Sequence, residues 1–125
     1  MAKRIFMISL VLCVIWGTAA AASAGFEEDF FKTSKGDLKI TFIAHGTLMM
    51  TWAGKVIHVD PVGGYASYAE MPKADLVLVT HEHGDHLDVK AIAELKKWGT
   101  QVVATKKCSG RVPGAILMAN GQDGE

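Results

Sequence analysis

The sequence has little cysteine and no excess of charge of either sign. Its 125 residues include only two cysteines, and thirteen basic side chains balance thirteen acidic ones. Cys13 lies in the apolar N-terminal segment, so processing would leave Cys108 alone, which excludes an internal disulfide and predicts a buried, inert thiol. A balanced charge offers no basic field for nucleic acid or anionic lipid. The pairs Lys96-Lys97 and Lys106-Lys107 are interpreted as solvated faces and strand ends.

The sequence also lacks an N-terminal apolar run long enough to span a bilayer, which needs about 18 to 20 residues. Lys3 and Arg4 precede a shorter apolar stretch that gives way to small residues ending in Ala22-Ser23-Ala24. That order is typical of a secretory signal peptide, and an uncleaved membrane anchor is the disfavoured alternative. We therefore predict a signal peptide at 1–24 and an exported protein, periplasmic or secreted, without a stable membrane anchor after cleavage. Its net charge would be about −2.

The remaining chain begins with strand patterns. Residues 25–36 show no clear period and are predicted to be a lead-in segment, so the domain is expected to span 37–125. Residues 38–44 alternate in the manner of a strand, and further strands are predicted at 48–52 and 55–59, joined by a tight hairpin. Large apolar side chains of these strands are predicted to form core: Phe42, Met49, Met50 and Trp52.

An α/β pattern follows. Residues 74–80 form a continuous apolar strand, suited to burial on both faces, that delivers His81 at its carboxyl end. Asp88 is placed to cap a helix that has one apolar face, and Gly99 is predicted to end that helix. Residues 101–105 are predicted to form the next strand. A strand meander running into a β-α-β unit predicts an α/β fold of layered α+β type.

Residues 81–86 read His-Glu-His-Gly-Asp-His and place four potential metal ligands in six positions. Positions two apart in extended chain point the same way, so His81 and His83 can converge on one cation. Gly84, free to adopt a positive φ, would let Asp85 and His86 face a second cation. Mixed nitrogen and oxygen donors suit zinc or a similar divalent metal. A histidine-rich surface loop without metal is the alternative, because these residues alone complete neither site.

The stretch 80–88 resembles the H-x-H-x-D-H motif of the metallo-β-lactamase superfamily. Segments 43–47, 59–61 and 74–80 are similar to its branch related to ascorbate-6-phosphate lactonase. This resemblance implies the N-terminal half of an αββα sandwich, with His81 and His83 on a first metal and Asp85 and His86 on a second. It also implies that Asp60 supports the ligand loop from behind.

The family takes its remaining ligands from later motifs, whereas this sequence has no histidine after His86. The chain is therefore expected to be incomplete and inactive alone. His45 is left out of the ligand set, and His58 is interpreted as an ordinary strand histidine.

When completed, the protein is predicted to be a hydrolase that uses a metal-bound hydroxide on a small-molecule ester, lactone, amide or phosphoester, with Asp85 helping to hold the nucleophile. The expected cofactor is zinc, as two ions, with manganese or iron as substitutes. A non-catalytic metal-binding remnant is the alternative.

Overall fold

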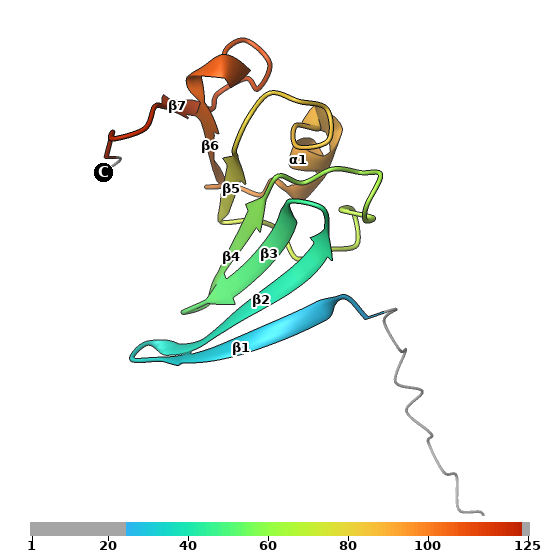
Figure 1. Cartoon of the computed structure of the whole chain (residues 1–125), viewed down its shortest axis with the longest axis vertical. Helices are drawn as coiled ribbons and strands as arrows, with labels where there is room; N and C mark the ends of the chain where they lie inside the picture. The colour runs from blue at the N-terminus through green and yellow to red at the C-terminus, as the bar shows by residue number, and fades with distance from the viewer. Residues whose placement is uncertain (1–24, 124–125) are drawn as a thin grey trace, which may run out of the picture.

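The computed structural model describes residues 25–123, and the predicted signal peptide lies outside this range. The described residues contain seven strands and one short α-helix. The strands join in a single sheet in the order β1 to β7 (Figure 1). The elements are β1 (Glu27–Thr33), β2 (Gly36–Ala44), β3 (Thr47–Trp52), β4 (Lys55–Val59), β5 (Leu76–Val79), α1 (Val89–Leu95), β6 (Gln101–Thr105), the 3-10 turn η1 (Lys106–Cys108) and β7 (Ile116–Met118).

The first four strands form an antiparallel meander. The hairpin between β3 and β4 turns at Ala53 and Gly54, with φ values of 49° and 74°. Two positive φ angles in a two-residue loop match the right-handed twist of the paired strands, so the predicted tight hairpin is confirmed. The turn between β2 and β3 also uses a positive φ, 53° at His45, which brings this side chain to the end of the sheet where β4 finishes.

Strand β1 stands where the sequence predicted an irregular lead-in segment. It pairs with β2 along its whole length, from Glu27 opposite Phe42 to Thr33 opposite Gly36. All seven residues are exposed, so the strand has no buried face to impose an alternating pattern. Backbone pairing and an ion pair of 2.9 Å between Lys39 and Glu28 hold it instead.

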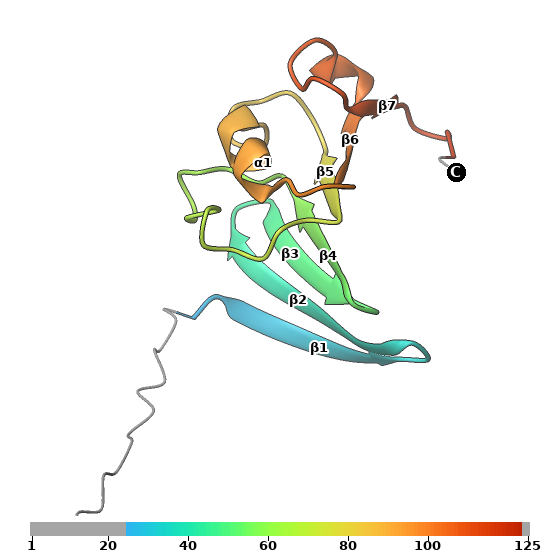
Figure 2. The same cartoon turned by 180° about the vertical axis from the view of Figure 1, so that it is seen from behind.

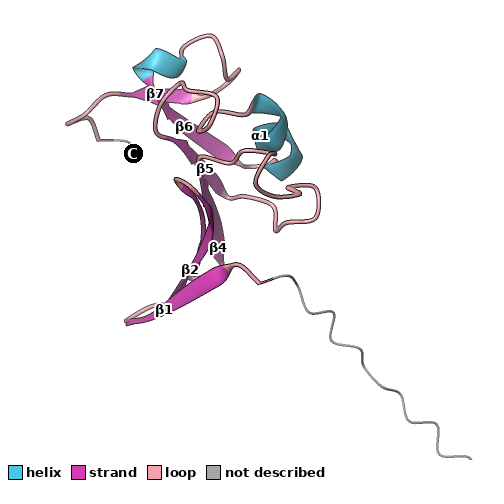
Figure 3. Ribbon diagram, turned by 45° about the vertical axis from the view of Figure 1, so that its right-hand side comes forward, coloured by secondary structure: helices cyan, strands magenta, loops and turns pink. Residues whose placement is uncertain are grey.

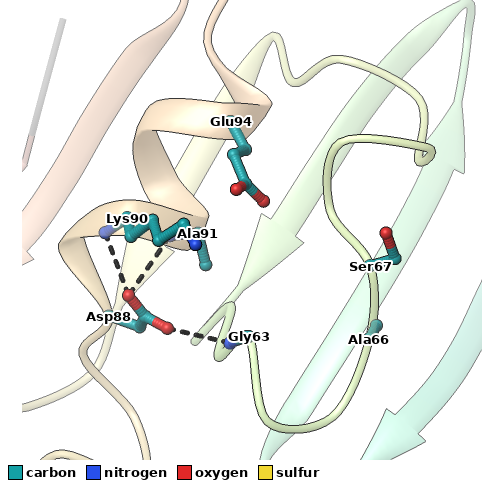
Figure 4. Close-up of a pocket in the computed structure, with 7 residues that line it drawn as sticks. All are labelled: Gly63, Ala66, Ser67, Asp88, Lys90, Ala91 and Glu94. Carbon is teal, nitrogen blue, oxygen red and sulfur yellow. Dashed lines mark hydrogen bonds between the residues drawn. The ribbon is translucent and has the colours of Figure 1, made fainter.

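From β4 onward the strands are parallel. The crossover between β5 and β6 contains α1, which Asp88 caps by accepting hydrogen bonds from the backbone N–H groups of Lys90 (2.9 Å) and Ala91 (3.2 Å). The same carboxylate accepts from the backbone N–H of Gly63 at 2.9 Å, so it also ties the helix to the β4–β5 loop (Figure 4). The predicted cap is confirmed, although the helix ends at Leu95, before Gly99.

Helix α1 and the β4–β5 loop lie on one face of the sheet (Figures 2 and 3). Val77 and Val79 of β5 are buried, whereas Leu76 and Leu78, which point to the opposite face, are only half-buried. Burial on both faces of this strand is therefore not observed within residues 25–123. Residues 25–123 contain no candidate membrane-spanning helix.

The same arrangement corrects part of the predicted core. Phe42 is 39% and Trp52 36% exposed, whereas Met49 is 7% exposed. Thr41 and Ile43 occupy the face of β2 that is covered, so Phe42 must point the other way. The layered α+β class is confirmed, and the described residues contain one sheet and its single helical layer.

Candidate metal centre

The histidine-rich loop leaves β5 at its carboxyl end and turns back at once. The backbone N–H groups of His86 and Leu87 both donate to the carbonyl of His83, at 3.0 Å and 2.8 Å. Leu87, 4% exposed, anchors the end of the turn in the core. Gly84 does not take a positive φ, contrary to the sequence prediction. Hydrogen bonding to His83, and not glycine freedom, therefore redirects the chain.

The predicted ligand residues converge. The rings of His81 and His83 have centroids 4.8 Å apart, and those of His81 and His86 are 4.0 Å apart. Donor atoms fall into three overlapping groups, and the atoms within each group lie no more than 4.8 Å from one another. These groups are His45, Asp85 and His86; Asp60, His81 and His86; and His81, His83 and Asp85.

Asp60 lies behind this cluster and is 2% exposed. Its carboxylate accepts from the backbone N–H of Thr80 at 2.7 Å and from the Thr80 hydroxyl at 2.6 Å. It also lies 2.8 Å from Nδ1 of His86. A carboxylate bonded to Nδ1 fixes the ring and leaves Nε2 available, which is a common way of orienting a metal-ligating histidine. The geometry therefore favours an orienting role for Asp60.

The backbone of Asp60 is also unusual, with φ 46°. Such a conformation is uncommon for a residue other than glycine and persists only where the surroundings hold it. Here the Asp60 N–H donates to the Leu78 carbonyl at 2.9 Å, and its own carbonyl accepts from the Thr47 hydroxyl at 2.7 Å. These bonds fix Asp60 between β3 and β5 and so fix His86.

His45 belongs to the cluster although the sequence prediction left it out. Its Nε2 lies 3.2 Å from a carboxylate oxygen of Asp85, and its ring centroid is 5.0 Å from that of His86. The neighbouring Gly46 approaches His86 so closely that an added Cβ would lie 2.9 Å from Cε1 of the imidazole. The available signals were a histidine followed by glycine immediately after a strand and the resemblance of segment 43–47 to the family, and neither reveals a contact with residues forty positions later.

Hydrogen bonds and charge keep the carboxylates of the loop ionised. The pKa of Asp85 is lowered, first by its own backbone N–H and then by His86 and His45. The pKa of Glu82 is lowered by its own backbone N–H and then by Lys107. Arg111 donates a hydrogen bond to the Glu82 carbonyl, so the β6–β7 connection braces the loop from outside.

His58 lies outside the cluster, as predicted. It is fully buried, with Nε2 3.0 Å from the Pro72 carbonyl.

The donor set suits a transition metal. Imidazole nitrogens with one or two carboxylate oxygens are the usual ligands of zinc and similar divalent ions. Asp85 belongs to two of the three groups, so two neighbouring ions could share it. The fold and the site thus define a class of protein, an α+β sheet with a histidine and aspartate metal centre at the carboxyl ends of its strands.

Comparison with known proteins gives the family. Residues 39–119 match the β-lactamase superfamily domain, and the chain belongs to this family. It is 38% identical over 80 residues to a UPF0173 metal-dependent hydrolase of Thermodesulfovibrio yellowstonii, and this match covers 58% of this chain and 30% of the relative. It is 46% identical over 63 residues to a UPF0173 metal-dependent hydrolase of Flavobacterium johnsoniae, and this match covers 46% of this chain and 28% of the relative.

A solved structure agrees with the fold. A putative metal-dependent hydrolase from Parabacteroides distasonis superposes with a TM-score of 0.74 at 47% identity, covering 78% of this chain and 44% of the other. The chain thus spans less than half the length of the relatives it matches. These matches support the superfamily predicted from the loop motif, whereas the ascorbate-6-phosphate lactonase branch stays a prediction.

Proposed function

We propose that this chain carries the metal-binding part of an exported hydrolase acting on an ester, lactone, amide or phosphoester of a small molecule. The observation that carries the proposal is the convergence of the imidazoles and Asp85 at the end of β5, with Asp60 behind His86. Bound zinc ions, two in this proposal and replaceable by manganese or iron, would polarise the substrate and supply a water that is nucleophilic near neutral pH.

The position of each residue in the loop determines which metal ion it would bind. His81 and His83 hold one ion, and Asp85 and His86 hold the other. Asp85 is ionised and lies in two of the three donor groups, so it also helps to place the attacking water. A catalytic zinc commonly takes three protein ligands. His45, at 3.2 Å from Asp85, is placed to add a donor to the second ion.

Metal content of the full-length protein tests the site. His83→Ala should remove at least one of the two ions, measured by elemental analysis after dialysis, because that ion loses half of its donors in this loop. His58→Gln is the matched control, since His58 is buried outside the cluster. Circular dichroism confirms that both variants fold. Unchanged metal content in His83→Ala would overturn the assignment.

Turnover tests the reaction separately. The metal-loaded protein should hydrolyse at least one of a neutral aryl ester, a lactone, an anilide and a phosphodiester, and His83→Ala should not. A fully loaded protein that cleaves none of them would favour the alternative of a non-catalytic metal-binding module.

Export is proposed from the basic start, apolar run and small residues of 1–24, which lie outside the described residues. N-terminal sequencing of protein recovered outside the cytoplasm should begin at Gly25. Recovery with Met1 retained in the membrane fraction would contradict this.

A further inference from the structure

A hollow of about 320 Å³ opens beside the proposed metal centre, at the carboxyl ends of β5 and β6. His81 lines it on the side of the centre, and Lys106 and Lys107 line it from η1. Thr80, Thr105 and Asn120 add polar residues to the lining, and Met118 and Ala119 form its apolar part. A group bound in this hollow would therefore lie next to whatever the metal centre attacks.

The two lysines are exposed, and neither has an ion-pair partner in the part of the chain that the structure describes. Lys55 and Lys97, by contrast, lie 3.9 Å and 3.0 Å from Asp75. The acidic group that faces Lys107 is Glu82, a half-buried residue. One carboxylate offsets only part of the charge of two lysines, so the hollow keeps an excess of positive charge.

The fold places the pair Lys106-Lys107 beside the proposed metal centre. The sequence alone indicated only a solvated strand end, because residues 106–107 follow β6 and give no sign of what lies beside them. Parallel pairing of β5 with β6, in register from Leu76 opposite Gln101 to Val79 opposite Ala104, brings their carboxyl ends together. Lys106 and His81 thereby come to line the same space.

We propose that this hollow is a subsite for an anionic group, phosphate or carboxylate, that the substrate carries beside its scissile bond. Lysine ammonium groups bind both anions as point charges, and the Asn120 amide adds a hydrogen-bond donor. The subsite proposal rests on the proposed function for the nature of the scissile bond. Binding of the anion itself does not depend on turnover.

Equilibrium binding tests the subsite without turnover. Inorganic phosphate and succinate are titrated into the metal-free protein at low ionic strength by calorimetry, so that bound metal cannot hold the anion. Lys106→Gln with Lys107→Gln should weaken binding of the preferred anion by about tenfold or more, because two charge-assisted contacts are lost. Lys96→Gln, an exposed lysine after α1 and away from this hollow, should leave the affinity unchanged.

The preference between phosphate and succinate identifies the anion, and either preference supports the subsite. Undetectable binding of both anions, or equal affinity in the double variant and the parent protein, would overturn it. Because both lysines are exposed, the melting temperature of the double variant should match that of the parent, which separates lost binding from lost folding.

A matched pair of esters separates this proposal from the proposed function. With metal bound, KM for mono-4-nitrophenyl succinate should rise in the double variant while kcat is retained. KM for the neutral 4-nitrophenyl acetate should not change. Lysine-dependent anion binding without hydrolysis of any ester, lactone, anilide or phosphodiester would keep the subsite and remove the proposed function. Hydrolysis indifferent to the lysines would remove the subsite alone.

Discussion

Gly46 leaves no room for a side chain between the β2–β3 turn and the metal centre. An added Cβ would lie 2.9 Å from Cε1 and 3.2 Å from Nδ1 of His86, and 3.9 Å from a carboxylate oxygen of Asp60. Contacts below 3.0 Å force something to move. Asp60 holds the His86 ring at Nδ1, so the turn and the imidazole must separate.

Gly46→Ala should therefore weaken metal binding by about tenfold or more, in the range found when the groups supporting a ligand are disturbed. Competition with a chromophoric chelator measures this affinity. Gly64→Ala is the matched control, because a Cβ at Gly64 meets nothing within 4 Å and its φ is not positive. Equal affinities in the two variants would show that His86 tolerates the displacement.

At this scale the sequence predicted the residues that are neighbours along the chain. His81, His83, Asp85 and His86 could be recognised together because they lie within six positions. Asp60 was recognised only through resemblance. His45 and Gly46 were missed as parts of the site because their partners lie about forty residues away, and only the pairing of β2, β3 and β4 with β5 brings them together.

Asp88 links two elements, since one carboxylate caps α1 and accepts from Gly63 in the β4–β5 loop (Figure 4). Asp88→Ala should lower the free energy of unfolding by about 1 to 2 kcal/mol, the usual effect of losing an N-cap. Urea denaturation measures the change.

Asp88→Asn provides the control, because its amide oxygen can still accept from the helix N–H groups. It should restore most of the loss. A full loss in Asp88→Asn, equal to that of alanine, would mean that the negative charge and not the cap is what stabilises this junction.

Elements with one buried face were predictable, and those without one were not. The β3–β4 hairpin, β6 and the start of α1 agree with their patterns because burial and turn chemistry point to the same structure. Strand β1 has seven exposed residues and left no such pattern. For β2 the alternation was visible, but the sequence placed Phe42 on the covered face, which Thr41 and Ile43 occupy instead. Local alternation does not reveal which face later segments of the chain will cover.

The stability of the whole molecule should depend on pH through His58. This side chain is fully buried against the edge of the Tyr68 ring, and its Nδ1 has no hydrogen-bond partner among residues 25–123. The neutral tautomer with a proton on Nε2 donates to the Pro72 carbonyl. Burial lowers the pKa of His58 from its ordinary value of 6.5, an effect that the Pro72 contact partly opposes.

A lowered pKa in the folded state means that the unfolded chain binds more protons once the pH falls below about 6.5. Stability is therefore kept above this pH and decreases as the pH falls toward the folded-state pKa. His58→Gln, which can still donate to Pro72, should flatten the fall in the free energy of unfolding between about pH 7 and pH 5. Only position 58 differs between the two proteins, so the difference between their pH profiles isolates His58, and identical profiles would contradict the assignment.

The change from antiparallel to parallel pairing at β4 has a consequence for assembly. Hairpins such as β3–β4 close over two residues, whereas β4 and β5 can pair only after residues 60–75 have closed a much longer loop. Asp60 follows β4 and Thr80 follows β5, so the hydrogen bonds between them form only when this slow, non-local step is complete. A metal ion that reaches the chain earlier meets His81, His83, Asp85 and His86 on an unbraced loop. Capture of the ion at full affinity is thereby coupled to completion of the sheet.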